Sequence, residues 1–184
     1  GALVIDGSNR EPFGGDIAIE NGMITEVSPS IKDGGKAVVE AGGLVAAPGF
    51  IDIHSHTDLT IFKHHLAESK ALQGVTTEVI GNCGIGGFPV DDKRKAILID
   101  YLKMHEFHLP SYGLDWNNFT QYADRLDRSG LGLNLAPLVA HGALRIATLG
   151  TKDGIPSDKE LKSMKRLLAD SLEQGAWGLS TGLI

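Results

Sequence analysis

The stretch APGFIDIHSHTD, Ala47 to Asp58, decides the fold, because an apolar run in it ends in two histidines that are one residue apart. We predict a strand over residues 45–54. Side chains at positions i and i+2 of a strand project from the same face, so His54 and His56 should point the same way, and so should Asp52. Two imidazoles that converge at a strand end suit Zn²⁺ or a similar cation, whereas solvated surface histidines are the alternative.

From this strand onward, predicted strands alternate with predicted helices. Further apolar runs cover residues 75–81, 131–139 and 177–181. The clearest helix, Ser157–Gly175, begins with a capping box and ends at a glycine, and a second helix is predicted over Leu114–Leu126. Strands that alternate with helices pair in parallel, because consecutive parallel strands need a long crossover. Such a sheet is either doubly wound or a (β/α)₈ barrel.

The number of strand–helix units indicates part of a barrel. About four units, over residues 45–184, are roughly half of a (β/α)₈ barrel. In residues 1–44, Asn21-Gly22 between short apolar runs is a strong hairpin signal. We therefore predict an α/β fold, with a partial (β/α)₈ barrel over residues 45–184 that follows a small β-sandwich segment over residues 1–44. Half a barrel cannot close, so we expect the chain to be an incomplete piece of a longer protein.

The composition argues against several classes of function. The chain has 184 residues and a net charge of −6, whereas a nucleic-acid-binding surface needs clustered basic residues. Its longest stretch without a formal charge, residues 129–144, contains Asn, Pro and His and indicates buried structure, not a membrane span. Cys83 is the only cysteine, which excludes an intrachain disulfide and fits a reducing compartment. We expect a cytoplasmic protein with no nucleic-acid or membrane partner.

Cys83 is the second indication of a metal site. It follows the predicted strand over residues 75–81, and four glycines lie close to it in sequence. Their spacing does not fit the dinucleotide-binding pattern G-x-G-x-x-G. A lone cysteine is commonly a small buried apolar residue. Here, however, the cysteine and the two histidines follow neighbouring strands, and a metal ion would bind the cysteine as a thiolate.

Four blocks of this sequence resemble the D-aminoacylase (N-acyl-D-amino-acid deacylase) family of the amidohydrolase superfamily. They are APGFIDIHSHTD, GVTTEVIGNCGIGGFPV, LNLAPLVAHGALR and QGAWGLSTGLI. The block DIAIENGMITEV is similar to the small β-domain that precedes the metal-dependent-hydrolase barrel in that superfamily. The resemblance covers almost the whole chain. Its specific part is GNCG, since His-x-His alone indicates only the superfamily.

The resemblance implies a zinc-dependent enzyme that hydrolyses the linear amide bond of N-acyl-D-amino acids and releases a carboxylate and a D-amino acid. It places His54 and His56 at one metal position and Cys83 at another, tighter position, where many amidohydrolases use a carboxylated lysine. The fourth strand, WGLST, contains no lysine. The other family ligands, two histidines and an aspartate, and the general base are expected beyond Ile184. The fragment alone is therefore expected to be inactive.

Three residues near strand ends are candidates for support of the metal ligands. We expect Asp58 to orient a metal-bound histidine, a common need of such imidazoles, unless it is the N-cap of a helix over residues 59–70. Ser180 and Thr181, at the end of the fourth predicted strand, are candidates for the same kind of support.

Two further residues are candidates for contact with the substrate. His141 and Arg145 follow the third predicted strand, and arginine suits a substrate carboxylate. An ordinary exposed arginine is the alternative for Arg145.

A helix predicted over residues 93–106 is a candidate to cover the site. The remaining histidines are expected at the surface: His64, His65, His105 and His108.

Two other functions stay open from the sequence. Another amidohydrolase, such as a cyclic-amide hydrolase or a dipeptidase-like enzyme, would share the fold and His-x-His. A non-catalytic barrel fragment would lack the later ligands. The partners expected of the enzyme are a small-molecule N-acyl-D-amino acid and the C-terminal part of the same chain.

Overall fold

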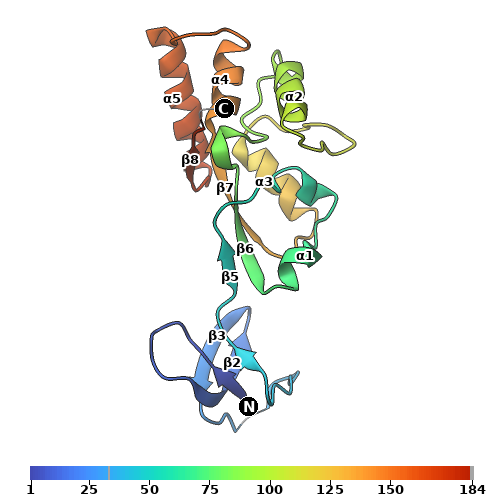
Figure 1. Cartoon of the computed structure of the whole chain (residues 1–184), viewed down its shortest axis with the longest axis vertical. Coiled ribbons are helices and arrows are strands. Elements are labelled where there is room, and N and C mark those ends of the chain that lie inside the picture. Colours follow the sequence, from blue (N-terminus) through green and yellow to red (C-terminus); the bar gives the residue numbers. More distant parts are fainter. Residues whose placement is uncertain (33, 183–184) are drawn as a thin grey trace. The chain divides into compact units, whose positions relative to one another are not determined.

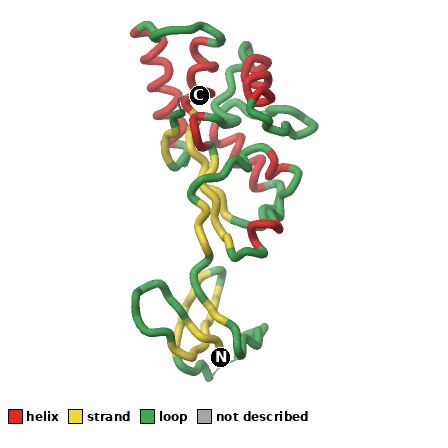
Figure 2. The backbone as a smooth tube through the Cα atoms, viewed as in Figure 1, coloured by secondary structure: helices red, strands yellow, loops and turns green. Residues whose placement is uncertain are grey.

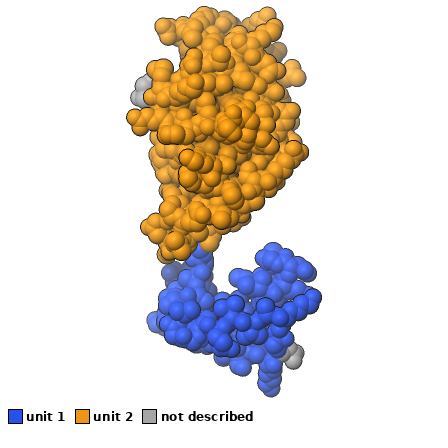
Figure 3. Space-filling model, turned by 90° about the vertical axis from the view of Figure 1, so that its right-hand side faces the viewer, with its two compact units in different colours: residues 1–49 blue, residues 50–184 orange. Residues whose placement is uncertain are grey.

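The computed structural model describes residues 1–32 and 34–182 of the chain. The chain forms two compact units, Gly1–Gly49 and Phe50–Ile184, which are coloured separately in Figure 3. Each unit is built around its own sheet, and Figure 1 labels the helices and most of the strands.

The first unit is a four-stranded sheet in the order β3-β2-β1-β4. Its strands are β1 Ala2–Val4, β2 Phe13–Glu20, β3 Met23–Ser28 and β4 Val45–Ala46. The predicted hairpin is confirmed, because β2 and β3 pair antiparallel and both Asn21 (φ 52°) and Gly22 (φ 77°) have the positive φ that a type I′ turn requires. No second sheet is found among the described residues of this unit, so the predicted β-sandwich segment corresponds to one layer.

The strand predicted over residues 45–54 is wrong as a single element. Its first part, β4, pairs in parallel with β1 in the first unit, whereas β5 (Phe50–Asp52) pairs with a strand of the second unit. Pro48 lies between them and has no backbone N–H to donate to a sheet. The first unit therefore extends to Gly49 and does not end at residue 44.

The second unit contains a four-stranded parallel sheet in the order β5-β6-β7-β8. Its strands are Phe50–Asp52, Val75–Ile80, Asn134–Ala140 and Gly178–Ser180. Each strand lies beside the next one in the chain. A doubly wound sheet reverses this order at its switch point, so the continuous progression favours the wall of a barrel. The predicted α/β class and its parallel half-barrel sheet are confirmed.

Helices connect the strands of the second unit (Figure 2). They are α1 Glu68–Ala71, α2 Lys95–Met104, α3 Phe119–Asp127, α4 His141–Leu149 and α5 Asp158–Glu173, with 3₁₀ turns at Thr60–Phe62 and Asn82–Gly84. The predicted capping box of α5 is present between Ser157 and Glu160. The helix predicted over Leu114–Leu126 begins later, because Asn118 caps it. The helix predicted over residues 59–70 is instead a 3₁₀ turn followed by α1. Within the described residues, no helix has the length and apolar character to cross a membrane.

Buried aromatic residues anchor the segments that follow β5 and β6. Trp116, Tyr122 and Phe88 are almost completely buried, and the rings of Phe88 and Tyr122 stack with their centroids 4.9 Å apart. The indole N–H of Trp116 donates to the carbonyl of Gly87 (2.8 Å), after β6. The Tyr122 hydroxyl donates to the carbonyl of Asp58 (2.9 Å), after β5. The α3 region thus ties both segments to the core.

Candidate metal centre

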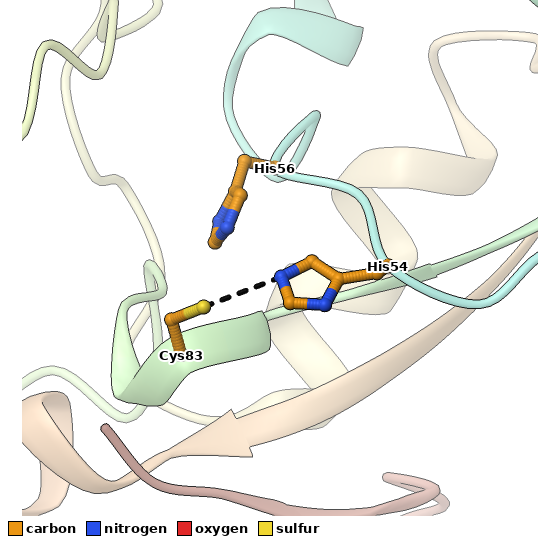
Figure 4. A group of neighbouring side chains, drawn as sticks. All are labelled: His54, His56 and Cys83. Carbon is orange, nitrogen blue, oxygen red and sulfur yellow. Dashed lines mark hydrogen bonds between the residues drawn. The ribbon is translucent and has the colours of Figure 1, made fainter. Parts of the chain in front are cut away.

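The three predicted metal ligands lie together in the structure. His54 and His56 follow β5, and Cys83 lies in the 3₁₀ turn after β6 (Figure 4). One ligand atom from each residue lies within 4.8 Å of the other two. Cys83 Sγ is 3.2 Å from His54 Nε2, and the two imidazole centroids are 5.4 Å apart. The division of these residues between two metal positions stays a prediction.

The histidines do not converge by strand alternation, contrary to our expectation. β5 ends at Asp52, and the chain bends through residues 53–54. The carboxylate of Asp52 forms an ion pair with Lys70 of α1 and accepts a hydrogen bond from the N–H of His54 (3.2 Å). The hydrogen bond with Lys70 is the largest cause of the lowered pKa of Asp52. A bend after the strand, and not the period of two, therefore brings both rings to Cys83.

The residues Gly81–Gly84, which we call the cysteine turn, have an unusual backbone. Gly81, Cys83 and Gly84 have φ of 79°, 55° and 74°, in the left-handed region. A Cβ on Gly81 would lie 2.3 Å from the carbonyl oxygen of Leu138 in β7, so only glycine fits at this position. A left-handed conformation is uncommon for a residue with a side chain, and it is found often at functional sites. This backbone conformation holds the Cys83 side chain beside the histidines.

Ser180 supports the cysteine turn from β8. Its hydroxyl accepts a hydrogen bond from the N–H of Gly84 (3.0 Å) and donates one to the carbonyl of Gly81. The buried Ser180 side chain thus bridges the two ends of the turn. Thr181 is exposed, and no hydrogen bond joins its side chain to the site in the part of the chain that the structure describes. Ser180 thus supports the turn through its side chain, whereas Thr181 lies against Gly84 through its backbone.

Asp58 is buried beside the cysteine turn and is 1% exposed. Burial raises the pKa of its carboxyl to about 7, hydrogen bonds from the backbone N–H groups of Asp58 and Gly81 oppose this rise, and the nearby charge of Glu78 adds to it. Its Oδ2 has no hydrogen-bond partner among the described residues. The helical turn that follows has Leu59 as its N-cap and no side-chain cap, so the alternative role of Asp58 as an N-cap is wrong. The structure places the carboxylate against the cysteine turn and gives it no hydrogen bond to a histidine within the described residues.

The two predicted substrate residues lie on α4. His141 is the first residue of this helix, and the helix approaches the cysteine turn at the next residue, since a Cβ on Gly142 would be only 2.7 Å from the carbonyl oxygen of Gly84. Arg145 donates hydrogen bonds to two carbonyls of the loop after α4, both at 3.2 Å. This guanidinium therefore holds a loop and is half-buried, a role that differs from both the predicted substrate contact and the ordinary exposed arginine. The remaining histidines lie outside the cluster of metal-ligand side chains: His64, His65, His105 and His108.

Glu78 and Phe107 are the residues of the site that sequence reasoning missed. Glu78 is completely buried in β6 and forms an ion pair with Lys70, whose pKa is raised by hydrogen bonds to Asp52 and to Glu78. A charged residue inside the run VTTEVI was the available signal. Phe107, in the loop after α2, packs edge-to-face on the ring of His56 with centroids 5.9 Å apart. That loop has no periodic pattern from which its position could be predicted.

The three donors suit a borderline cation such as Zn²⁺. Imidazole nitrogens and a thiolate bind Zn²⁺ at about 2.0–2.3 Å in tetrahedral sites, so the ligand atoms of one ion lie about 3–4 Å from one another. In this cluster the Cys83–His54 separation of 3.2 Å falls in that range, and all three ligand atoms lie within 4.8 Å of one another. Burial, followed by the nearby His54, lowers the pKa of His56, which favours the neutral imidazole that binds a metal.

Comparisons with known proteins found related sequences. The model of the amidohydrolase family matches residues 37–183. The N-acyl-D-aspartate deacylase of Alcaligenes xylosoxydans xylosoxydans is 35% identical over 182 residues, which are 99% of this chain and 35% of that protein.

Solved structures show the same relationship. The N-acyl-D-glutamate deacylase from Bordetella bronchiseptica, complexed with zinc and a phosphonate inhibitor, is 31% identical with a TM-score of 0.78; the match covers 100% of this chain and 37% of that one. A D-aminoacylase with a binuclear metal centre is 31% identical with a TM-score of 0.80, over 99% of this chain and 37% of that one. The chain thus spans 35–37% of the length of these proteins.

Proposed function

Because the chain belongs to the amidohydrolase family, we propose that it is the N-terminal part of a zinc-dependent enzyme that hydrolyses the amide bond of N-acyl-D-amino acids. The products are a carboxylate and a D-amino acid. Relatives named for deacylation of N-acyl-D-aspartate and N-acyl-D-glutamate support this substrate class. Their greater length supports a C-terminal part of the same protein that completes the barrel and the site.

The observation that carries the proposal is the convergence of His54, His56 and Cys83 after two neighbouring parallel strands. In a (β/α)₈ barrel, reactive groups collect at the C-terminal ends of the strands. These residues would hold the zinc, which would supply a bound water of lowered pKa and a Lewis acid for the acyl carbonyl. A carboxylate from the C-terminal part is the proposed general base, which then protonates the leaving amine.

Within this chain, Phe107 and His141 are the proposed substrate contacts. Phe107 packs edge-to-face with the His56 ring, and His141 is the first residue of α4, which approaches the cysteine turn at Gly142. An aromatic side chain at this position excludes water from one side of the metal centre and offers an apolar wall to an acyl group.

We also propose a cytoplasmic location. Cys83 must stay a reduced thiolate in order to bind zinc, and reducing compartments keep thiols in that state. The proposed partner is a small-molecule substrate, with no nucleic acid and no membrane. Fractionation of cells that make the complete protein tests this location, and recovery of the protein from an oxidising compartment would contradict it.

The complete protein tests the function directly. We expect zinc to copurify with it, and we expect hydrolysis of N-acetyl-D-aspartate or N-acetyl-D-glutamate but not of their L-enantiomers. Cys83→Ala should lose both bound zinc and activity, whereas the control His64→Ala, at an exposed residue outside the cluster, should keep both. Hydrolysis of cyclic amides or L-substrates alone would indicate another amidohydrolase. No hydrolysis of any of these by zinc-loaded protein would indicate a non-catalytic barrel.

A further inference from the structure

Glu78 is a completely buried carboxylate that the proposed reaction does not use. Among the described residues, its oxygens contact three side chains. Oε1 accepts a hydrogen bond from Ser55 Oγ (3.2 Å) and lies 3.0 Å from Lys70 Nζ, and Oε2 accepts one from Thr57 Oγ1 (2.7 Å). Ser55 and Thr57 are the residues immediately before and after His56. One carboxylate therefore holds the chain on both sides of this histidine.

The same network reaches His54. Lys70 forms ion pairs with both Glu78 and Asp52, and Asp52 accepts a hydrogen bond from the His54 N–H (3.2 Å). Glu78 of β6, Lys70 of α1 and Asp52 of β5 thus form one network of ion pairs. We call residues 52–57 the histidine segment. The network includes Asp52 and forms hydrogen bonds with three further residues of this segment: His54, Ser55 and Thr57.

Hydrogen bonds that do not involve Glu78 also hold the histidine segment. Beyond the end of β5, the Ser55 N–H donates to the carbonyl of Val79 (3.1 Å), and the Asn82 side-chain amide donates to the carbonyl of Ser55 (3.1 Å). Both hydrogen bonds act on one residue. After His56, the Thr57 hydroxyl donates to the buried carboxylate, and the Thr57 and Asp58 carbonyls accept hydrogen bonds from the Ile61 N–H and the Tyr122 hydroxyl. Glu78 is the group among these that also contacts the residue before His56.

Stability alone does not explain a charged pair at this position. A buried carboxylate and ammonium lose their hydration, and well-packed apolar residues of similar volume are commonly at least as stable. The nearest residues of β6 are threonine, valine and isoleucine, so an apolar residue would suit the strand. What an apolar residue could not provide is a pair of acceptors for the hydroxyls on both sides of His56.

We propose that Glu78 is a positioning residue for the metal centre, which fixes the histidine segment relative to Cys83 through its contacts with Ser55, Thr57 and Lys70. This inference rests on the proposed zinc site. Glu78 is not itself a member of the cluster of metal-ligand side chains. It acts through the backbone that carries the two histidines.

The test is a titration of the complete protein, stripped of metal, with Co²⁺, whose absorption reports a bound thiolate and the coordination geometry. Lys70→Met/Glu78→Met replaces both charges with apolar side chains of similar length. Glu78→Gln keeps the shape of the side chain and one acceptor oxygen, and its NH₂ group can donate to the other hydroxyl. We expect the double variant to keep its thermal stability without metal. We also expect it to bind Co²⁺ at least about 10-fold more weakly, with an altered spectrum. Glu78→Gln should stay within about 3-fold of the parent, and so should Glu68→Met at an exposed position of α1.

Glu78→Met alone leaves Lys70 without its buried partner and is expected to be the least stable variant, so the double variant carries the test. If the double variant binds Co²⁺ as tightly as the parent does, the positioning role is overturned while the zinc site stands. If the Co²⁺ affinity of each variant falls only in proportion to its thermal stability without metal, then Glu78 has a purely structural role. That result also overturns the inference. If neither the parent nor Cys83→Ala binds Co²⁺, the proposed zinc site itself fails, and the inference fails with it.

Discussion

Replacement of Asp58 by asparagine should remove a pH dependence of folding stability. Burial raises the pKa of this carboxyl from 3.8 to about 7 in the folded protein. Between these values the unfolded chain has released its proton while the folded protein retains it, so the folded state loses stability as the pH rises. The slope is at most about 1.4 kcal/mol per pH unit, and over this window it amounts to about 4 kcal/mol. Below about pH 4 this destabilisation is absent, and above about pH 7 it is complete.

The assay is equilibrium unfolding in urea between pH 4 and 8.5, followed by the fluorescence of the buried Trp116. A chelator is present throughout, because metal binding adds its own pH dependence. The amide side chain in Asp58→Asn keeps an acceptor for the N–H of Gly81 but carries no charge, so the stability of the variant relative to the parent should increase by about 4 kcal/mol over this range. Asp153→Asn, at an exposed position, is the control. A difference between parent and Asp58→Asn that stays constant with pH would refute this reasoning.

Three other perturbations test the surroundings of the metal centre. Ser180→Ala removes the hydroxyl that bridges the cysteine turn and should lower the free energy of unfolding by about 1–3 kcal/mol in urea denaturation; an unchanged value contradicts a supporting role. Gly81→Ala should prevent folding or lower the thermal midpoint far more than Gly154→Ala. Both glycines have positive φ, but only at Gly81 would a Cβ meet a backbone oxygen, so equal effects on circular-dichroism melts would exclude the steric argument. Phe107→Ala should weaken Co²⁺ binding about 2- to 10-fold, since the aromatic contact with His56 contributes about 0.5–1.5 kcal/mol; a larger loss would mean that the loop does more than pack on the ring.

The parts of the fold that depend on local patterns could be predicted from the sequence. The hairpin at Asn21-Gly22 and the capping box of Ser157 and Glu160 are each determined by residues a few positions apart. The order of the four parallel strands follows from their alternation with helices. That order places the ends of β5 and β6 side by side, which is why the proximity of Cys83 to the histidines was also predictable.

The remaining features depend on contacts between distant segments. α4 has no side-chain N-cap and has Gly142 in its first turn, so its sequence gives little local indication of a helix. The helix is stabilised by burial of its apolar face, which includes Leu144 and Ile146. The complete burial of Glu78 depends on its register opposite Asp52 and on a lysine of α1 that pairs with both carboxylates. The periodicity of apolar residues alone predicts neither this strand register nor which lysine pairs with Glu78.

The two sides of the metal centre are held by different physical means, and this difference bears on metal affinity. The cysteine turn is held directly by two neighbouring strands. Gly81 packs against the backbone of β7, and the hydroxyl of Ser180 on β8 forms a hydrogen bond with the turn. The histidine segment lies beyond the end of β5 and depends on side-chain charges and hydrogen bonds that each need correct geometry. A preorganised ligand loses less conformational freedom when it binds an ion than a ligand on a less constrained segment does. This asymmetry gives a physical reason to expect that a position dominated by Cys83 binds metal more tightly than one dominated by the two histidines.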